Sequence, residues 1–310
     1  MTNTNSIVLD PNDPNYNYGI PRKSIHFILP AGGVRGSFQA GFMYELFTKY
    51  RKWFTVYRID GTSVGSINGI TSLCGEFEVL KELWCSMKNI NDFFSKWSTV
   101  PVIGKLKSLF HGFYNNGVYN NKLLNTKLKT NLTNHISTMG KADLDKFACV
   151  VTDVDNGNSR YIFGSDPHIL EYITASASPW IISNPKTIDG VLYTDGALLE
   201  TYPIKNVNPK KVDHVVIVGF DQEIVQFEKP DTSNMLYYLA ALLDISRFHS
   251  ENSLRIKELV KSGKCIPITN MMTAVMDNFN QETIVEGFEQ GQRMATLFYK
   301  TYLNKFTENL

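Results

Sequence analysis

The amino-acid sequence predicts an α/β fold with a mainly parallel central sheet. Residues 24–29 (SIHFIL) and 54–59 (FTVYRI) are short apolar runs typical of buried strands. Each run is followed by a loop that contains glycine and then by a helical stretch, at residues 36–50 and 66–74. A strand, a loop and a helix that occur twice in succession are the usual start of a parallel sheet with helical crossovers.

The pattern continues after one interruption. Residues 79–138 combine helical periodicity at their start with an aromatic segment rich in glycine and asparagine, and we interpret them as an insertion beside the functional site. Strand patterns return at residues 147–164, where FACVVTD and SRYIFG predict a hairpin. A helix is then expected from residue 167 to Pro179, because proline ends a helical pattern.

The last third of the chain predicts further elements of the same class. Residues 191–194 form an apolar run, and residues 214–218 (HVVIV) are expected to be another core strand. Two amphipathic helices are predicted within residues 235–260 and 282–306, on either side of a short strand (CIPI).

The domain organisation follows from the same pattern. The first residues are rich in asparagine and proline, which predicts a flexible tail over residues 1–22. No internal repeat and no linker interrupts the rest of the sequence. We therefore expect a single α/β domain over residues 23–310.

Composition and charge limit the partners. The 310 residues contain 31 Lys and Arg against 30 Asp and Glu, so no strong overall field attracts nucleic acid, and we expect none as a partner. The sequence has no run of about 18 apolar residues and no visible secretory signal, which predicts a cytoplasmic or peripheral membrane location. The cysteines lack the CxxC spacing of zinc sites, and we expect them to be reduced thiols.

A serine lies in the loop between the second expected strand and its helix. Residues 61–65 (GTSVG) match the pattern G-x-S-x-G, which places Ser63 on a sharp turn and projects its hydroxyl above the sheet. The flanking Gly61 and Gly65 allow the turn to close without Cβ clashes. Ser63 is therefore a candidate nucleophile, and the alternative is an ordinary turn in which Ser63 or Ser66 caps the helix.

A glycine-rich loop follows the first expected strand at residues 31–36 (AGGVRG). Its backbone N–H groups should point into the same crevice as Ser63, because neighbouring parallel strands end at one edge of the sheet. An oxyanion needs about two such donors near 3 Å. Arg35 is expected to fix the loop, to attract an anionic head group or to form a surface salt bridge. A rival interpretation is a dinucleotide-binding loop with Asp60 on the ribose, although Ala31 replaces its first glycine.

Asp195 directly follows the apolar run at residues 191–194. The end of a strand is where such sheets place functional groups, although an isolated aspartate there is more often a turn residue. None of the histidines lies in a motif that marks it as a general base; they are His26, His111, His135, His168, His214 and His249. A Ser–His–Asp triad is the second interpretation, since Ser63, Asp195 and His249 follow the α/β-hydrolase order.

Four segments occur along the chain in this order: PAGGVRGSFQAG, IDGTSVGSING, ITASASPWIISNP and YTDGALLETYP. As a set they resemble the patatin-like phospholipase family over residues 25–203. The resemblance implies a three-layer α/β/α sandwich with a mainly parallel sheet. It also implies a Ser–Asp dyad without histidine, no metal or other cofactor, and hydrolysis of ester-linked acyl groups.

The resemblance also implies roles for single residues. Ser63 would be the nucleophile and Asp195 the base. The oxyanion hole would be formed by the backbone N–H groups of Gly32, Gly33 and Arg35. The motif glycines that support these turns would be Gly36, Gly61, Gly65 and Gly196. The sequence departs from the family pattern at Ala31 in the first loop and at Trp180 and Ile181, which follow the proline of the third segment and reshape the expected acyl pocket.

The expected substrate is a phospholipid or lysophospholipid at a membrane or micelle surface. The aromatic segment from Phe93 to Tyr119, which includes Lys105 and Lys107, is interpreted either as a lid or interfacial patch or as core. A hypothesis of another class is a catalytically silent lipid-binding protein that keeps the fold. The intact Ser63 and Asp195 favour the enzyme.

Overall fold

The computed structural model describes most of the 310-residue chain: residues 22–92, 95–96, 119–179, 183–220, 251–270, 272 and 280–304. Several sequence predictions lie outside these ranges. They concern the tail at residues 1–21, most of the aromatic segment with Lys105 and Lys107, the pair Trp180 and Ile181, and the histidines His111 and His249. The first half of the helix expected at residues 235–260 also lies outside them.

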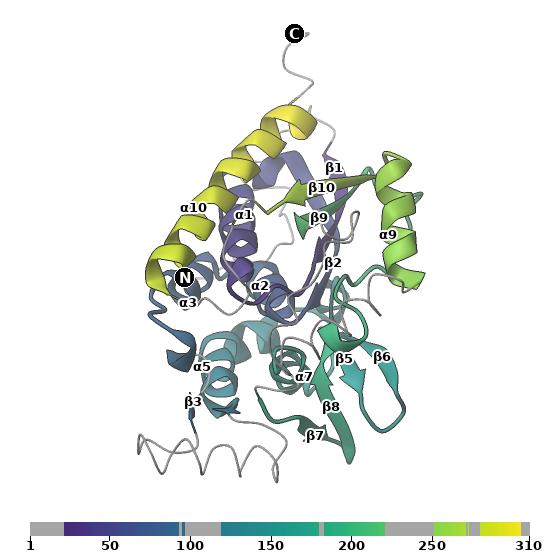
Figure 1. Ribbon diagram of the computed structural model, residues 1–310. Helices are drawn as coiled ribbons and strands as arrows, with labels where there is room; N and C mark the ends of the chain where they lie inside the picture. The colour runs from purple at the N-terminus through teal and green to yellow at the C-terminus, as the bar shows by residue number, and fades with distance from the viewer. Residues whose placement is uncertain are drawn as a thin grey trace, which may run out of the picture.

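A central sheet runs through the described part of the chain (Figure 1). Its strands are β1 (Lys23–Leu29), β2 (Phe54–Thr62), β5 (Phe147–Asp153), β6 (Asn158–Phe163), β7 (Lys186–Ile188), β8 (Val191–Asp195), β9 (His214–Phe220) and β10 (Cys265–Thr269). The order is β10-β9-β1-β2-β5-β8-β7, and β6 pairs with β5 outside this path. Strands β10, β9, β1, β2 and β5 are parallel, whereas β6, β7 and β8 join by antiparallel pairing.

Helices cover both faces of the sheet (Figure 1). One face carries α1 (Gly36–Lys49), α2 (Val64–Leu73), α3 (Phe77–Cys85), α7 (Ile169–Ser176) and α10 (Gln281–Phe298). The other face carries α9 (Glu251–Lys261) and residues 202–207. The predicted three-layer α/β/α sandwich with a mainly parallel sheet is confirmed.

Shorter elements connect these layers. The helices α5 (Lys122–Thr138) and α6 (Lys141–Leu144) precede β5. The 3-10 turns are η1 (Gly33–Arg35), η2 (Arg51–Trp53), η3 (Ile90–Asp92) and η4 (Gly196–Leu198), and a π turn η6 (Tyr299–Leu303) follows α10. A separate two-stranded ladder pairs β3 (Ser95–Lys96) with β4 (Tyr119–Asn120).

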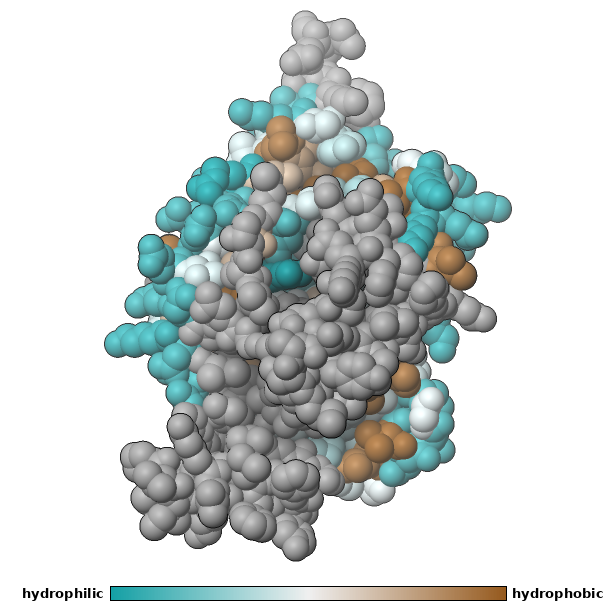
Figure 2. All heavy atoms as spheres, viewed as in Figure 1, coloured by the Kyte–Doolittle hydropathy of each residue, from teal (hydrophilic) through white to brown (hydrophobic). Residues whose placement is uncertain are grey.

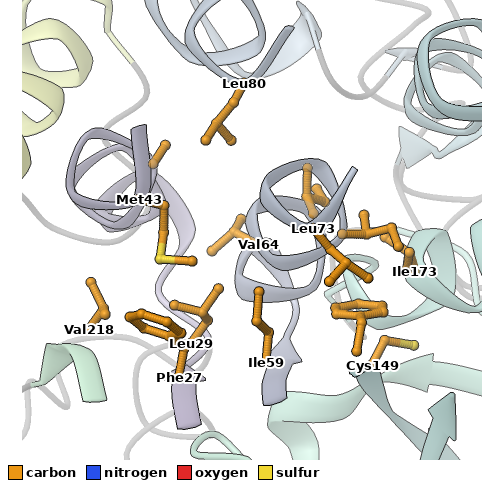
Figure 3. Close-up of a cluster of buried hydrophobic side chains, with 14 of the residues drawn as sticks. Phe27, Leu29, Met43, Ile59, Val64, Leu73, Leu80, Cys149, Ile173 and Val218 are labelled. Atoms are coloured by element: carbon orange, nitrogen blue, oxygen red, sulfur yellow. The ribbon is translucent and has the colours of Figure 1, made fainter. Parts of the chain in front are cut away.

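The main core lies between the sheet and the larger helical layer. Figure 3 shows strand side chains such as Phe27, Leu29 and Ile59 pointing toward Met43 of α1 and Val64 of α2. Alternate strand residues form a second cluster on the other face, which includes Ile28, Val215, Ile217, Ile204 and Ile256. Strand β1 is therefore buried on both faces, as its continuous apolar sequence predicts.

Helix α10 packs unusually close to α1. A Cβ atom at Gly41 of α1 would lie 1.9 Å from the carbonyl oxygen of Phe288, and one at Gly291 of α10 would lie 2.0 Å from that of Phe38. The opposite side of α10 is mostly hydrophilic, as Figure 2 shows at its left. Glycine at these two positions lets the helix backbones approach directly, so α10 holds the helix that follows the glycine-rich loop.

Candidate active site

The register of β5 brings two chain segments together. The last residue of β2, Thr62, pairs with Val150 of β5 in parallel orientation. The last residue of β8, Asp195, pairs with the next residue, Val151, in antiparallel orientation. Because β6 occupies the other edge of β5, the ends of β2 and β8 meet on a single edge. Ser63, the residue after Thr62, therefore lies next to Asp195.

Ser63 and Asp195 are joined by a hydrogen bond. The Ser63 hydroxyl donates to Asp195 Oδ2 at 2.9 Å, and the two residues are 6% and 4% exposed. The other carboxylate oxygen, Oδ1, accepts the backbone N–H of Ala197 at 2.8 Å. Thr152 Oγ1 donates to the carbonyl oxygen of Asp195 at 2.9 Å. The carboxylate is thus held in place, with one oxygen directed at the serine.

Ser63 occupies a backbone conformation that few serines adopt. Its φ is 56° and its ψ is −125°, at the junction of β2 and α2. A positive φ costs a residue with a Cβ about 1–3 kcal/mol, and such strain collects at functional sites. Ser63 is the N-cap of α2 but makes no capping hydrogen bond with its side chain, and Ser66 Oγ donates to Gly61 O instead. The alternative of an ordinary capping serine is therefore wrong.

Ser176, at the end of α7, supports this strained turn. Its Oγ accepts the backbone N–H of Ser63 at 2.9 Å and donates to Val150 O at 2.6 Å. It also lies 3.1 Å from Ser66 Oγ. Ser176 is fully buried, and it ties the turn at Ser63 to β5. Sequence reasoning did not single it out, although it lies in the third family segment.

We expect Ser176→Ala to lower the free energy of unfolding by about 2 kcal/mol, because the buried Ser63 N–H loses its Ser176 acceptor and Val150 O loses its Ser176 donor. Urea denaturation followed by circular dichroism measures this change. The matched control is Ser72→Ala: Ser72 is fully buried in α2, and its hydroxyl has no hydrogen-bond partner among the described residues. Equal stability of the two variants would contradict the role given to Ser176.

The motif glycines are required by packing. A Cβ at Gly61 would lie 2.5 Å from Gly65 O, and one at Gly65 would lie 2.0 Å from Leu29 O. A Cβ at Gly196 would lie 2.3 Å from Val150 O. The sequence attributed Gly61 and Gly65 to the tightness of the turn itself. The structure agrees for Gly61, whose Cβ would meet the backbone of the turn itself, whereas Gly65 and Gly196 let α2 and the segment after Asp195 lie directly on the strand backbones.

The glycine-rich loop lies beside the serine turn. Leu29 of β1 pairs with Gly61 of β2, so the loop after β1 and the turn after β2 leave the sheet at the same level. Gly33 has a φ of +53°, a left-handed conformation that favours glycine. A Cβ at Gly36 would lie 2.8 Å from Val64 Cγ2, which shows how closely the loop approaches α2.

One of the expected oxyanion donors is already engaged. The backbone N–H of Arg35 donates to Gly32 O at 3.0 Å within η1. The N–H groups of Gly33 and Val34 lie in the first turn of the same helical segment, where N–H groups lack an intrahelical acceptor. The backbone N–H groups of Gly33 and Val34 are therefore better candidates for oxyanion donors than that of Arg35. Gly32 is the N-cap residue that precedes this turn.

The segment after Asp195 is anchored on both sides. Glu200 is buried, its carboxylate accepts hydrogen bonds from Tyr161 Oη and from Ser159 Oγ, and burial raises the pKa of Glu200 above its ordinary value. Thr62 Oγ1 donates to Glu200 O at 3.1 Å. The backbone N–H of Ala31 donates to Thr201 O at 3.0 Å. This segment thus connects β6, the serine turn and the glycine-rich loop.

Asp60 is part of a buried ionic cluster. Its side chain is fully buried, with Oδ2 3.0 Å from His26 Nε2 and Oδ1 2.6 Å from Arg58 Nε. A carboxylate with these partners does not face a ribose, so the dinucleotide interpretation is wrong. His26 lies fully buried in β1 and contacts Asp60, so it is a structural histidine.

The remaining histidines of the described residues lie in other surroundings. His135 Nδ1 is 3.0 Å from Glu76, and His168 Nε2 is 3.6 Å from Asp189. Burial lowers the pKa of His214 below its ordinary value. The Ser–Asp contact is therefore direct, with no histidine between its two side chains.

Two further properties concern the described residues alone. No group of three His, Cys, Asp or Glu side chains within these ranges is arranged to hold a metal ion. No helix in the part of the chain that the structure covers is both long and apolar enough to span a bilayer. The cysteines are free thiols, and Cys74, Cys149 and Cys265 are buried.

The fold and the site define an α/β protein with a serine on a strand–helix turn, hydrogen-bonded to a carboxylate at the end of a neighbouring strand. The family model described as patatin-like phospholipase matches residues 27–207, more than half of the chain. The chain therefore belongs to the patatin-like phospholipase family, whose members are lipid acyl hydrolases.

Among solved structures, VipD from Legionella pneumophila is similar to this chain. The two share 14% sequence identity with a TM-score of 0.43, and the alignment covers 89% of this chain and 67% of VipD. No curated protein sequence matches the chain.

Proposed function

We propose that this protein hydrolyses carboxylic ester bonds of phospholipids or lysophospholipids with a Ser63–Asp195 dyad. The observation that carries the proposal is the 2.9 Å hydrogen bond from Ser63 Oγ to Asp195 Oδ2. A nucleophilic serine needs a base within about 2.6–3.2 Å, and this carboxylate meets the requirement. Family membership supports acyl-ester chemistry in general.

The first half of the reaction forms an acyl-enzyme. Ser63 Oγ attacks the ester carbonyl carbon while Asp195 takes the hydroxyl proton. The tetrahedral intermediate collapses, the bond to the alcohol oxygen breaks, and the proton on Asp195 passes to the leaving alcohol. The acyl group is then bound to Ser63 as an ester.

The second half releases the fatty acid. Asp195 deprotonates a water molecule, which attacks the acyl-enzyme, and the proton returns to Ser63 Oγ as it leaves. The hydrogen bond from Ala197 N–H to Asp195 Oδ1 holds the carboxylate in the same orientation through both halves. A single carboxylate thus serves as base and as acid in turn.

The oxyanion needs strong support, because a carboxylate is a weak base for an alcohol. The backbone N–H groups of Gly33 and Val34 are the donors we assign, with Gly32 next to them. Ser63 also lies at the N-terminus of α2, whose dipole stabilises negative charge by about 0.3–1 kcal/mol. Removal of one oxyanion donor in enzymes of this kind typically costs about 10²- to 10³-fold in kcat.

The dyad is favoured over a triad with His249 because the serine hydroxyl already donates to the aspartate. In a Ser–His–Asp triad an imidazole lies between these two side chains, and a separation of 2.9 Å leaves no space for it. The strain at Ser63 also favours an enzyme over a silent lipid-binding protein, because lipid binding alone does not require a serine with a φ of 56°.

The proposed substrate is presented at a membrane or micelle surface, with peripheral contact by the protein. This proposal is supported by the family's chemistry, because the lipid substrates of acyl hydrolases are insoluble in water and gather in membranes or micelles. The aromatic segment between Phe93 and Tyr119 remains our candidate for the contact surface, and most of it lies outside the described residues.

The function is tested with a fluorophosphonate probe, which reacts with activated serines. We expect the intact mass of the wild type to increase by one adduct, which peptide mapping locates on Ser63, and Ser63→Ala to give none. Ser72→Ala is the control, because Ser72 is an equally buried serine of the same helix. Fatty-acid release from phosphatidylcholine vesicles and lysophosphatidylcholine micelles then distinguishes the two substrates.

An adduct on another residue would contradict the assignment of Ser63. Folded wild-type protein that gives no adduct would instead support the silent lipid-binding protein. An inactive but folded His249→Ala variant would support the triad.

A further inference from the structure

We propose that Asn68, together with Gln39, is a positioning residue that fixes the glycine-rich loop relative to Ser63. This inference rests on the proposed function, because in it these two amides set the distance between the Ser63 nucleophile and the oxyanion donors of the loop. Among the described residues, the side-chain amides of Asn68 and Gln39 donate to the backbone around the loop and not to Ser63 or Asp195, so their role is exerted through the loop.

Asn68 lies on α2, five positions after Ser63. Its Nδ2 donates to Gly36 O at 2.9 Å and to Gln39 Oε1 at 3.2 Å. The side chain is fully buried. The helix that begins at the nucleophile therefore holds the C-terminal end of the glycine-rich loop.

Gln39 lies on α1 and holds the other end of the loop. Its Nε2 donates to Pro30 O at 2.7 Å, and the residue is 2% exposed. Pro30 and Gly36 border residues 31–35 on either side. One hydrogen-bonded amide pair therefore fastens both ends of the loop that carries the oxyanion donors.

Trp84 of α3 determines how the Asn68 amide is oriented. Its Nε1 donates to Asn68 Oδ1 at 2.8 Å, so Nδ2 is left to donate toward the loop. The Trp84 ring also packs on the loop, since a Cβ at Gly36 would lie 2.6 Å from its Cζ2 and Cη2 atoms. Trp84 thus donates to Asn68, and Asn68 donates to Gln39 and to Gly36 O. Gln39 in turn donates to Pro30 O, so these hydrogen bonds end at the two carbonyl oxygens that border the loop.

Loss of this amide pair should reduce the rate of reaction more than substrate binding. The loop donors act on charge that develops in the transition state, so a shifted loop lowers kcat and leaves KM nearly unchanged. Misplacement of catalytic groups by about 1 Å costs about 100-fold. A residue needed only for stability would not lower kcat while KM stays nearly unchanged.

The test compares Asn68→Leu with Thr71→Val, two variants of α2 that keep the side-chain shape. Thr71 is also fully buried, but its hydroxyl donates only within the helix, to Ile67 O at 2.8 Å. We expect kcat on a soluble p-nitrophenyl ester to fall about 100-fold in Asn68→Leu, with KM within about threefold of wild type. Thr71→Val should keep wild-type kcat. Equal kcat in the two variants would overturn the proposal.

A second variant and a second readout separate this inference from the proposed function. Gln39→Met removes the bond to Pro30 O while it keeps side-chain length, and it replaces Asn68→Leu if that variant does not fold. Hydrogen–deuterium exchange of residues 31–36 needs no activity, and it should be at least about tenfold faster in either variant than in Thr71→Val. Unchanged exchange would overturn the inference even if the wild type is active. Faster exchange in a protein without esterase activity would contradict the proposed function alone.

Discussion

Asp195→Asn should lower ester hydrolysis by about 10⁴-fold and leave the fold intact. General acid–base catalysis contributes about 10²- to 10⁴-fold, and Asp195 is the base in both halves of the proposed reaction. Asparagine has nearly the same shape, and its Oδ1 can still accept the N–H of Ala197. Its Nδ2 would face Ser63 Oγ as a donor, so it cannot remove the serine proton.

The loss is measured as kcat/KM on a soluble ester, with circular dichroism and urea denaturation to show that the variant is folded. His249→Ala is the companion variant, and the dyad predicts that it retains most of the activity. Wild-type activity in Asp195→Asn would contradict the dyad.

Gly291→Ala should lower the free energy of unfolding by about 3 kcal/mol. The new Cβ would lie 2.0 Å from Phe38 O, so α10 must move away from α1, and overpacking of this kind costs about 1–3 kcal/mol or more. Alanine favours a helix over glycine by about 1 kcal/mol, and this gain offsets part of the steric cost. Urea denaturation measures the change.

The control is Leu297→Ala, which lies on the exposed side of the same helix. Leu297 is 53% exposed, and its replacement should change the free energy of unfolding by less than about 0.5 kcal/mol. Equal stability of Gly291→Ala and Leu297→Ala would show that the close contact between α1 and α10 is not needed. Gly291 lies beyond the residues that match the family model, so the effect also tests whether this later part supports the fold.

Much of the fold could be predicted because local sequence patterns specify its strands and helices. The apolar runs at residues 24–29 and 54–59 lie within β1 and β2, and the expected hairpin is formed by β5 and β6. The antiparallel direction of β8 could not be predicted, since an apolar run carries no information on its partner. The three-residue strand β7 was missed because so short a run has no periodicity.

The site could be predicted in part for the same physical reason. Ser63 and Asp195 lie in short motifs at strand ends, and the structure brings them to 2.9 Å. Ser176, Asn68 and Gln39 could not be found in this way, because polar residues in apparent helices have no pattern that marks their partners. Their hydrogen bonds depend on where helices α7, α2 and α1 cross the sheet.

The meeting of β2 and β8 along one edge of β5 has a consequence for how the protein folds. Ser63 and Asp195 are 132 positions apart in the chain, so no local segment can bring them together. Contacts of such long sequence separation form slowly, since loop-closure entropy must be overcome before the contact stabilises the chain. Both strands must pair with β5 in register, because a slip of one residue in β8 would turn Asp195 to the other face. Recovery of esterase activity after dilution from denaturant therefore reports on long-range strand pairing, and it should lag behind the recovery of helical signal.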